Sequence, residues 1–121
     1  MTRKRTLISD GDAERVADTM FGLSAPSRVQ ILCCLLSGAH SVSELVEAVG
    51  VEQSAVSHQL RLLREHELVR VERVGQRRVY TLFDDHVVRL MEEALRHVAN
   101  RANRSSELGQ RLMRVTRRRA G

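Results

Sequence analysis

Three side chains near the end of the chain are of types that bind transition metals, and they stand at definite spacings. Asp84 and His86 lie two positions apart, and His97 follows eleven positions after His86. Imidazole nitrogens and carboxylate oxygens suit Zn²⁺, Ni²⁺ or Co²⁺, and the lack of a cysteine among them disfavours Cu⁺ and Cd²⁺. The segment 83–100 is therefore either half of a metal site or an ordinary amphipathic helix whose N-cap is Asp84.

Helix geometry limits how these donors could meet. At ~100° per residue His86 and His97 share one face of a helix, but a rise of ~1.5 Å per residue separates them by roughly 16 Å. One ion with ~2 Å bonds cannot touch both. An antiparallel second copy would bring Asp84 and His86 of one chain beside His97 of the other, and would create two equal sites. An apolar stripe beside the histidines predicts such a dimer: Val87, Met91, Ala94 and Val98.

Length and composition restrict the class of protein. A chain of 121 residues, 42% hydrophobic but only 2% aromatic, predicts one mainly helical domain or a small domain completed by dimerisation. No apolar run approaches the ~20 residues that cross a bilayer. The basic start MTRKR lacks the apolar stretch of a signal peptide. We therefore expect a cytoplasmic protein that makes no membrane contact.

The net charge of +5 comes from the two ends of the chain. Residues 1–6 contain three cations, and residues 101–121 contain seven arginines and one acidic residue. We expect a disordered basic arm at 1–10, a folded domain at 11–100 and an Arg-rich tail at 101–121. Basic ends alone are a weak indication of nucleic-acid binding, so the domain must supply a stronger one.

Helical periodicity predicts two helices at the start of the domain. They span 11–22 and about 26–37, with Pro26 in the first turn of the second. The adjacent Cys33 and Cys34 point ~100° apart on this helix, so they cannot easily share a metal or form an unstrained disulfide. They suit small apolar positions, with a thiol switch as the alternative.

A helix-turn-helix follows. Ser41 and Glu44 have the form of a capping box that opens a short helix at 41–49, and Gly50 ends it. A second helix at 53–66 has one apolar stripe and a polar, basic opposite face. This arrangement is typical of the helix-turn-helix that places its second helix in the major groove of DNA.

Residues 68–82 change from helical to alternating periodicity. They are rich in valine, and Gly75 with Gln76 stands where a hairpin should turn. A basic hairpin directly after a helix-turn-helix is a wing. The order of elements predicts a winged helix-turn-helix, mainly α with a small β-hairpin.

The polar face of the helix at 53–66 and the hairpin predict how DNA is bound. An amide pairs with adenine and a guanidinium with guanine, so Gln53 and Arg61 could read bases. Arg77 and Arg78 would contact the backbone or minor groove. The full set of expected DNA-binding residues is Gln53, Ser54, Ser57, His58, Arg61, Arg64, Arg77 and Arg78. His58 has an alternative role as a packing residue inside the helix-turn-helix.

Three stretches of the chain resemble the ArsR/SmtB family of bacterial metal-responsive transcriptional regulators. They are LSAPSRVQILCCLL, SVSELVEAVGVEQSAVSHQLRLLREHELV and VGQRRVYTL, and the resemblance covers about residues 12–100. It implies a homodimer that binds a palindromic operator, usually represses transcription and releases DNA when an inducer binds.

The resemblance also implies where an inducer would bind. A family site on the C-terminal helix has the pattern D-x-H, ten residues, then H-x-x-(E or H), which Asp84, His86 and His97 match and Asn100 does not. Glu93, one turn before His97, could supply the missing ligand. The family's C-V-C site has no counterpart in SELVEAV, which argues against a thiolate sensor of arsenic, lead or cadmium. The expected effector is Ni²⁺ or Zn²⁺, or else Co²⁺.

Two alternatives to metal sensing differ in how far they change the function. A regulator of the same fold could respond to redox state through Cys33 or Cys34, or to a protein partner. An enzyme would be a larger change, but the sequence has no Gly-rich phosphate loop, no nucleophile elbow and no HExxH motif. We therefore expect a protein that is not an enzyme.

Overall fold

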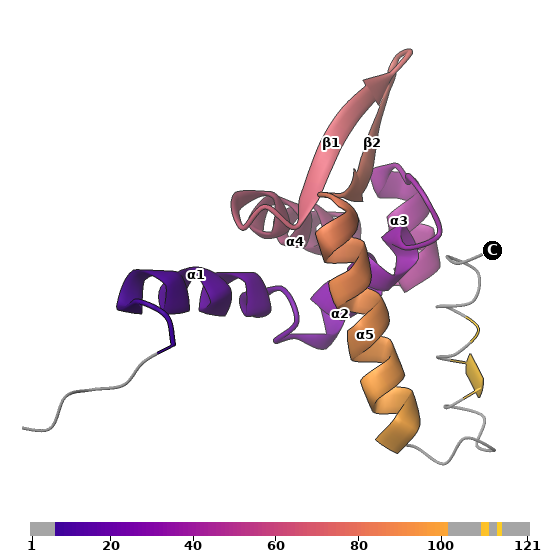
Figure 1. Cartoon of the computed structure of the whole chain (residues 1–121). Coiled ribbons are helices and arrows are strands. Elements are labelled where there is room, and N and C mark those ends of the chain that lie inside the picture. The colour runs from indigo at the N-terminus through magenta and orange to yellow at the C-terminus, as the bar shows by residue number, and fades with distance from the viewer. Residues whose placement is uncertain (1–6, 102–109, 112–113, 115–121) are drawn as a thin grey trace, which may run out of the picture.

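A computed structural model of the chain describes residues 7–101, 110, 111 and 114. In this part of the chain the elements follow the predicted order (Figure 1): α1 (Asp10–Phe21), α2 (Pro26–Leu35), α3 (Val42–Val49), α4 (Gln53–Glu65), β1 (Val69–Val74), β2 (Arg77–Leu82) and α5 (Asp85–Arg101). The winged helix-turn-helix architecture is confirmed, and the predicted helix ends lie within two residues of the observed ones. None of the helices described is long and apolar enough to cross a membrane.

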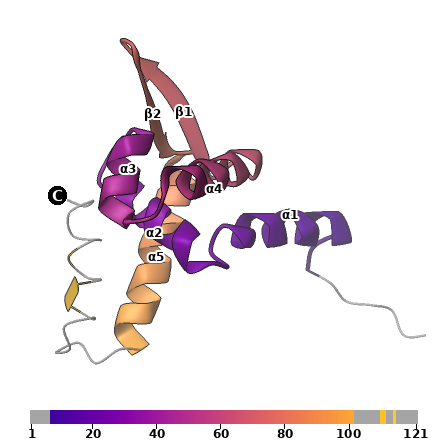
Figure 2. The same ribbon diagram turned by 180° about the vertical axis from the view of Figure 1, so that it is seen from behind.

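The core lies between α2, α3 and α4, with α5 and the base of the hairpin closing it (Figure 2). Leu32, Leu45 and Leu63, one each from α2, α3 and α4, have no exposed surface. Burial of a leucine side chain contributes about 2 kcal/mol, so these contacts fix α4 to the body through its inner face. The opposite face of α4 is left for a ligand.

The hairpin pairs β1 and β2 in antiparallel register from Val69 opposite Leu82 to Val74 opposite Arg77. Gly75 begins the turn with φ of +64°, a conformation that costs glycine little. His40, just before α3, pairs with Tyr80 through two backbone hydrogen bonds of 3.1 and 2.7 Å. The base of the hairpin is thereby tied to the helix-turn-helix, whereas its tip reaches away from the body.

The first helix stands apart from the rest of the fold. In both views α1 projects sideways from the body, and it has no buried residue (Figures 1 and 2). Its apolar residues Val16 and Met20 are 49% and 44% exposed. Within the described part of the chain, nothing buries these two side chains.

The apolar stripe predicted on α5 is partly wrong. Val87 and Met91 are 7% and 1% exposed because they pack into the core of their own chain, together with Leu95. Ala94 is half-buried and Val98 is 47% exposed. The apolar residues of α5 span a wide arc of the helix, and only the outer edge of that arc is free to meet a second copy.

A buried guanidinium joins α1 to α4, the second helix of the helix-turn-helix, which we call the recognition helix. Arg28 on α2 is 8% exposed. Its Nε donates to the Phe21 carbonyl (3.1 Å), its Nη2 to Ser24 Oγ (2.7 Å) and its Nη1 to Gln59 Oε1 of α4 (3.3 Å). Its Cζ also lies 4.1 Å from the centre of the Phe21 ring. All three acceptors are neutral, so hydrogen bonds and the cation–π contact compensate the loss of water.

The same joint requires a glycine after α1. A Cβ added to Gly22 would lie 2.1 Å from Leu68 Cδ1 and 3.4 Å from Leu63 Cδ2. Leu68 is 1% exposed and has little room to move. Phe21 also stacks on His66, with ring centres 4.6 Å apart. His66 is half-buried by this contact.

The Arg28 joint can be tested through stability. Arg28→Met removes three donors and the cation–π contact with Phe21 and leaves Gln59 Oε1 without this partner, so it should lower the free energy of unfolding by roughly 1–3 kcal/mol. Arg15→Met is the control. Arg15 pairs with Asp12 at 2.5 Å, but its side chain is 77% exposed, and such a pair contributes ~0–1 kcal/mol. Equal losses in urea denaturation of both variants would contradict the assigned role of Arg28.

Candidate functional site

The outer face of α4 carries the residues predicted to contact DNA. Val56, Leu60 and Leu63 are buried on its inner face. The residues predicted to read DNA are exposed on its outer side: Gln53, Ser54, Ser57, His58, Arg61 and Arg64. Burial of the inner row against the core fixes how α4 is turned about its axis, so the opposite side of the helix faces solvent.

His58 takes part in the outer face and does not pack inside the helix-turn-helix. Its side chain is exposed, and its Nδ1 lies 3.3 Å from Nη2 of Arg61. A hydrogen bond at this spacing restricts the guanidinium of Arg61, a group suited to bidentate contact with guanine. The two residues thus act as a pair on the surface.

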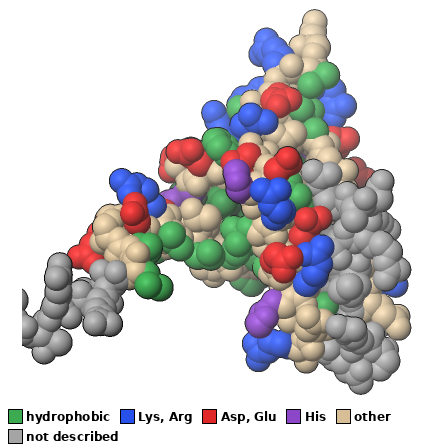
Figure 3. Space-filling model, in the orientation of Figure 1, with side chains coloured by type: hydrophobic (Ala, Val, Ile, Leu, Met, Phe, Trp, Pro, Cys, Tyr) green, Lys and Arg blue, Asp and Glu red, His purple; other side chains and the backbone are tan. Residues whose placement is uncertain are grey.

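The wing carries cations beside the recognition helix. Lys and Arg side chains gather along the hairpin in Figure 3. Arg78 is exposed opposite Arg73 in the register, and Arg77 is exposed opposite Val74. Arg77 also donates to Glu44 of α3 at 2.8 Å. The wing arginines lie on the same side of the fold as Gln53, since one hollow is lined by all three residues.

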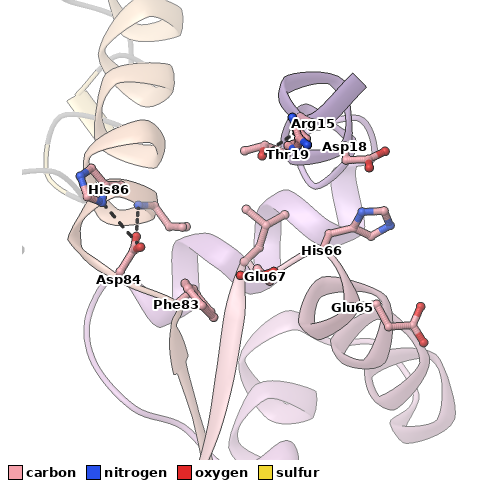
Figure 4. Close-up of a pocket in the computed structure, with 11 residues that line it drawn as sticks. Arg15, Asp18, Thr19, Glu65, His66, Glu67, Phe83, Asp84 and His86 are labelled. Carbon is pink, nitrogen blue, oxygen red and sulfur yellow. Dashed lines mark hydrogen bonds and ion pairs between the residues drawn. The ribbon is translucent and has the colours of Figure 1, made fainter. Parts of the chain in front are cut away.

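Asp84 and His86 lie together at the start of α5 (Figure 4). Oδ2 of Asp84 is 3.5 Å from Nδ1 of His86, and Oδ1 accepts the backbone N–H of Val87 at 3.0 Å. The pKa of Asp84 is lowered chiefly by the Val87 hydrogen bond and then by His86. Asp84 is therefore both the N-cap of α5 and an ionised carboxylate next to an imidazole that is 84% exposed.

The other candidate ligands continue along the exposed side of α5. His86, Glu93, His97 and Asn100 are all exposed, and positions 7, 11 and 14 residues after the first lie within about 40° of it on a helix. They form one row. Within the described residues of this single chain, no three His, Cys, Asp or Glu side chains come close enough to hold a metal ion. A site that uses both ends of the row needs a second chain.

The donor types fit a borderline divalent ion. The Asp84–His86 pair offers one oxygen and one nitrogen from adjacent, accessible side chains, and His97 offers a second nitrogen. Glu93 forms an ion pair with Arg96, and this cation would compete with a metal for its carboxylate. Glu93 is thus a less favourable ligand in the structure than the sequence suggests.

The Asp84–His86 pair borders an open hollow of about 410 Å³ (Figure 4). Its walls come from α1, the end of α4 and the first turn of α5, so the pair faces α1 across the hollow. Four acidic residues line it with two histidines: Asp18, Glu65, Glu67, Asp84, His66 and His86. A change in the position of α1 would therefore alter the surroundings of Asp84 and His86.

The two cysteines lack the properties of reactive thiols. Both are free and half-buried against the core. Burial raises the pKa of Cys33, with Cys34 adding to the effect, and burial followed by Glu44 raises the pKa of Cys34. Thiolate is the reactive form, so a raised pKa argues against a redox switch at this pair.

Comparison with known proteins agrees with this geometry. Residues 25–71 match the model of the family described as bacterial regulatory protein, arsR family. The HTH-type transcriptional regulator NmtR of Mycobacterium tuberculosis is 51% identical over 85 residues, which cover 70% of this chain and 71% of NmtR. The chain belongs to the ArsR/SmtB family. It is a DNA-binding transcriptional regulator and not an enzyme.

Further relatives extend the likeness over the whole domain. The transcriptional repressor SmtB homolog of a Synechocystis strain is 38% identical over 92 residues, 76% of this chain and 70% of that protein. The solution structure of apo-NmtR has a TM-score of 0.67 and 42% identity, covering 88% of this chain and 90% of that one. The homodimeric winged helix-turn-helix domain Mb0332 of Mycobacterium bovis has a TM-score of 0.69 and 27% identity, covering 85% and 97%. The fold of an ArsR/SmtB repressor is thereby confirmed.

The sequence did not predict the tertiary contacts of two residues that support the candidate DNA-binding surface. Glu44 was assigned only to the capping box, although it also binds Arg77 of the wing. Gln59 was left without a role, although it joins Arg28 to the recognition helix. Neither pairing has a local signal, because the partners are 33 and 31 positions apart.

The DNA face can be tested by comparing base-reading with backbone contact. Arg61→Ala should reduce the preference for operator over random DNA by ~1–3 kcal/mol, because a guanidinium reads guanine. Arg78→Ala should weaken both complexes alike and reduce the salt slope of binding by about one contact. Fluorescence anisotropy titrations at several salt concentrations measure both effects. Unchanged specificity in Arg61→Ala would show that α4 does not read the operator through this residue.

Proposed function

We propose that this protein is a homodimeric repressor that binds a palindromic operator and responds to a transition metal held between two α5 helices. The observation that carries the proposal is the exposed donor row on α5, which begins with Asp84 and His86 at 3.5 Å from each other. The family membership supports DNA binding and repression.

Two copies would complete the sites in a specific way. In an antiparallel pair of α5 helices, Asp84 and His86 of one chain would meet His97, and Asn100 or Glu93, of the other. Each dimer would then hold two equal sites. Two nitrogen donors with oxygen donors suit Ni²⁺, Zn²⁺ or Co²⁺. When bound, the metal would supply bonds across the interface and so favour one arrangement of the two chains over another.

The uncovered apolar residues support a dimer built from the terminal helices. Val16 and Met20 on α1 and Val98 on α5 are 49%, 44% and 47% exposed. In Figure 3 hydrophobic side chains gather on the underside of α1 and in the angle between α1 and the body. Mb0332, whose fold is similar, is described as homodimeric. A second copy that covers α1 and the outer edge of α5 would bury these residues.

Substitution of Val98 tests this interface. Val98→Glu should raise the dimer dissociation constant by at least about tenfold, because a buried unpaired carboxylate costs more than the ~1.4 kcal/mol that this factor represents. Val74→Glu is the control, since Val74 is 60% exposed at the tip of the wing and makes the same chemical change elsewhere. Sedimentation equilibrium measures both. A Val98→Glu protein that dimerises like Val74→Glu would place the interface elsewhere.

Subunit mixing tests whether each metal site is shared. In homodimers, His86→Ala and His97→Ala should each abolish tight Ni²⁺ and Zn²⁺ binding at both sites. A mixed dimer with His86→Ala in one chain and His97→Ala in the other should bind one ion with near-native affinity, because both missing ligands fall in the same site. Equilibrium dialysis of purified mixed dimers counts the ions.

The opposite results have distinct meanings. A mixed dimer that binds no ion would mean that each site is built within one chain or includes both histidines of both chains. Native protein that binds neither ion would contradict metal sensing at α5 and leave the family's DNA-binding function intact. Lowering the pH should weaken metal binding, because protons compete with the metal for the ligand atoms.

A further inference from the structure

An ion pair links the wing to the short helix α3 across the DNA-facing side. Nη2 of Arg77 lies 2.8 Å from Oε1 of Glu44, and the two side chains are 61% and 48% exposed. The residues are 33 positions apart, so the tertiary fold brings them together. Arg77 is one of the two wing arginines expected on the DNA backbone, and in the free protein a carboxylate already holds it.

Glu44 is itself held in place on α3. The same Oε1 accepts the backbone N–H of Ser41 at 2.8 Å, while Ser41 Oγ accepts the backbone N–H of Glu44 at 3.2 Å. The pKa of Glu44 is lowered, chiefly by the hydrogen bonds with Ser41 and further by Arg77. The carboxylate is therefore ionised at neutral pH, and its position follows that of the helix and not that of the wing.

The pair borders a hollow on the face that would meet DNA. It has a volume of about 560 Å³ and is lined by Ser41, Val42, Ser43, Glu44, Gln53, Arg77 and Arg78. Gln53 begins the recognition helix, so a duplex that lies over α4 and the wing passes this hollow. Arg78 is exposed beside Arg77, and within the described residues no ion pair engages it. One of two neighbouring arginines is thus neutralised internally.

We propose that Glu44 competes with the DNA backbone for Arg77, so that a phosphate must displace its carboxylate when the wing docks. Carboxylate and phosphate oxygens accept the same charge-assisted hydrogen bonds from a guanidinium. An exposed ion pair contributes only ~0–1 kcal/mol, so the exchange is readily reversible. Glu44 then remains near the phosphate and repels it. Because backbone contacts are independent of sequence, this competition weakens binding to operator and random DNA alike.

Such competition would make dissociation from DNA easier, which suits a regulator that must leave its operator. Backbone contact supplies affinity without selectivity, and Glu44 reduces that part while the base-reading contacts of α4 remain. The inference rests on the proposed contact between Arg77 and DNA. The same ion pair could have the opposite effect. If Glu44 orients Arg77 toward the phosphate, removal of the Glu44 carboxylate would weaken DNA binding.

Glu44→Gln separates these two effects. Glutamine keeps the capping box, because an amide oxygen also accepts the Ser41 N–H, and it removes the charge. The variant should bind operator and random DNA about two- to fivefold more tightly, the range that release of an exposed ion pair permits. Glu47→Gln is the matched control, since Glu47 is exposed on the same helix and loses the same charge. Thermal melting checks that both variants remain folded.

A double-mutant cycle locates the effect at Arg77. Arg77→Gln should weaken DNA binding more in the Glu44→Gln protein than in the native protein, because only in the former is the guanidinium free beforehand. Glu44→Gln affinity equal to that of Glu47→Gln, or below native, overturns the inference. If Arg78→Gln still weakens binding in that case, the DNA face itself stands. If neither arginine matters, both the wing contact and the inference fail.

Discussion

The buried guanidinium of Arg28 is the contact on which the arrangement of the helices depends. It holds the carbonyl at the end of α1, the hydroxyl of the following turn and an amide on α4, with neutral acceptors throughout. The planar guanidinium directs its donors from three separate nitrogens, and each of them meets one of these acceptors. One side chain thus links the end of α1 to α4, which the core already holds through its buried row. In a dimer joined through α1, that joint lies between the interface and the DNA.

The sequence predicted the fold well wherever the signal is local. The capping box of Ser41 and Glu44 is present as predicted, Gly50 ends α3, and the hairpin turns at Gly75. Each of these depends on residues a few positions apart, so the pattern alone determines the outcome. The end of α4 shows the limit of such signals. The chain leaves that helix through Glu67 in a left-handed conformation (φ 57°), a position where glycine would be expected.

The candidate site could be predicted only in part, because its geometry combines local spacing with tertiary packing. The donor row on α5 follows from helical periodicity and was found as a row. The apolar stripe beside it was misjudged, since Val87 and Met91 face the chain's own core and only Val98 is largely exposed. Periodicity gives the angle between two residues and not the direction of the core. The same reason explains why the Arg77–Glu44 ion pair and the packing of His66 against Phe21 were missed.

Asp84 contacts both the buried and the exposed side of the first turn of α5. Asp84 lies between the end of β2 and the buried Val87, and its carboxylate binds the Val87 N–H with one oxygen and faces His86 with the other. The preceding residue, Phe83, donates its backbone N–H to the carbonyl of Leu68 at 2.9 Å, next to β1. In the proposed metal site, a bond to Asp84 would therefore act on the cap of α5 and on the base of the wing together. A ligand on the outer row of α5 need not reach α4 directly, because the base of the wing is joined to this first turn through Phe83.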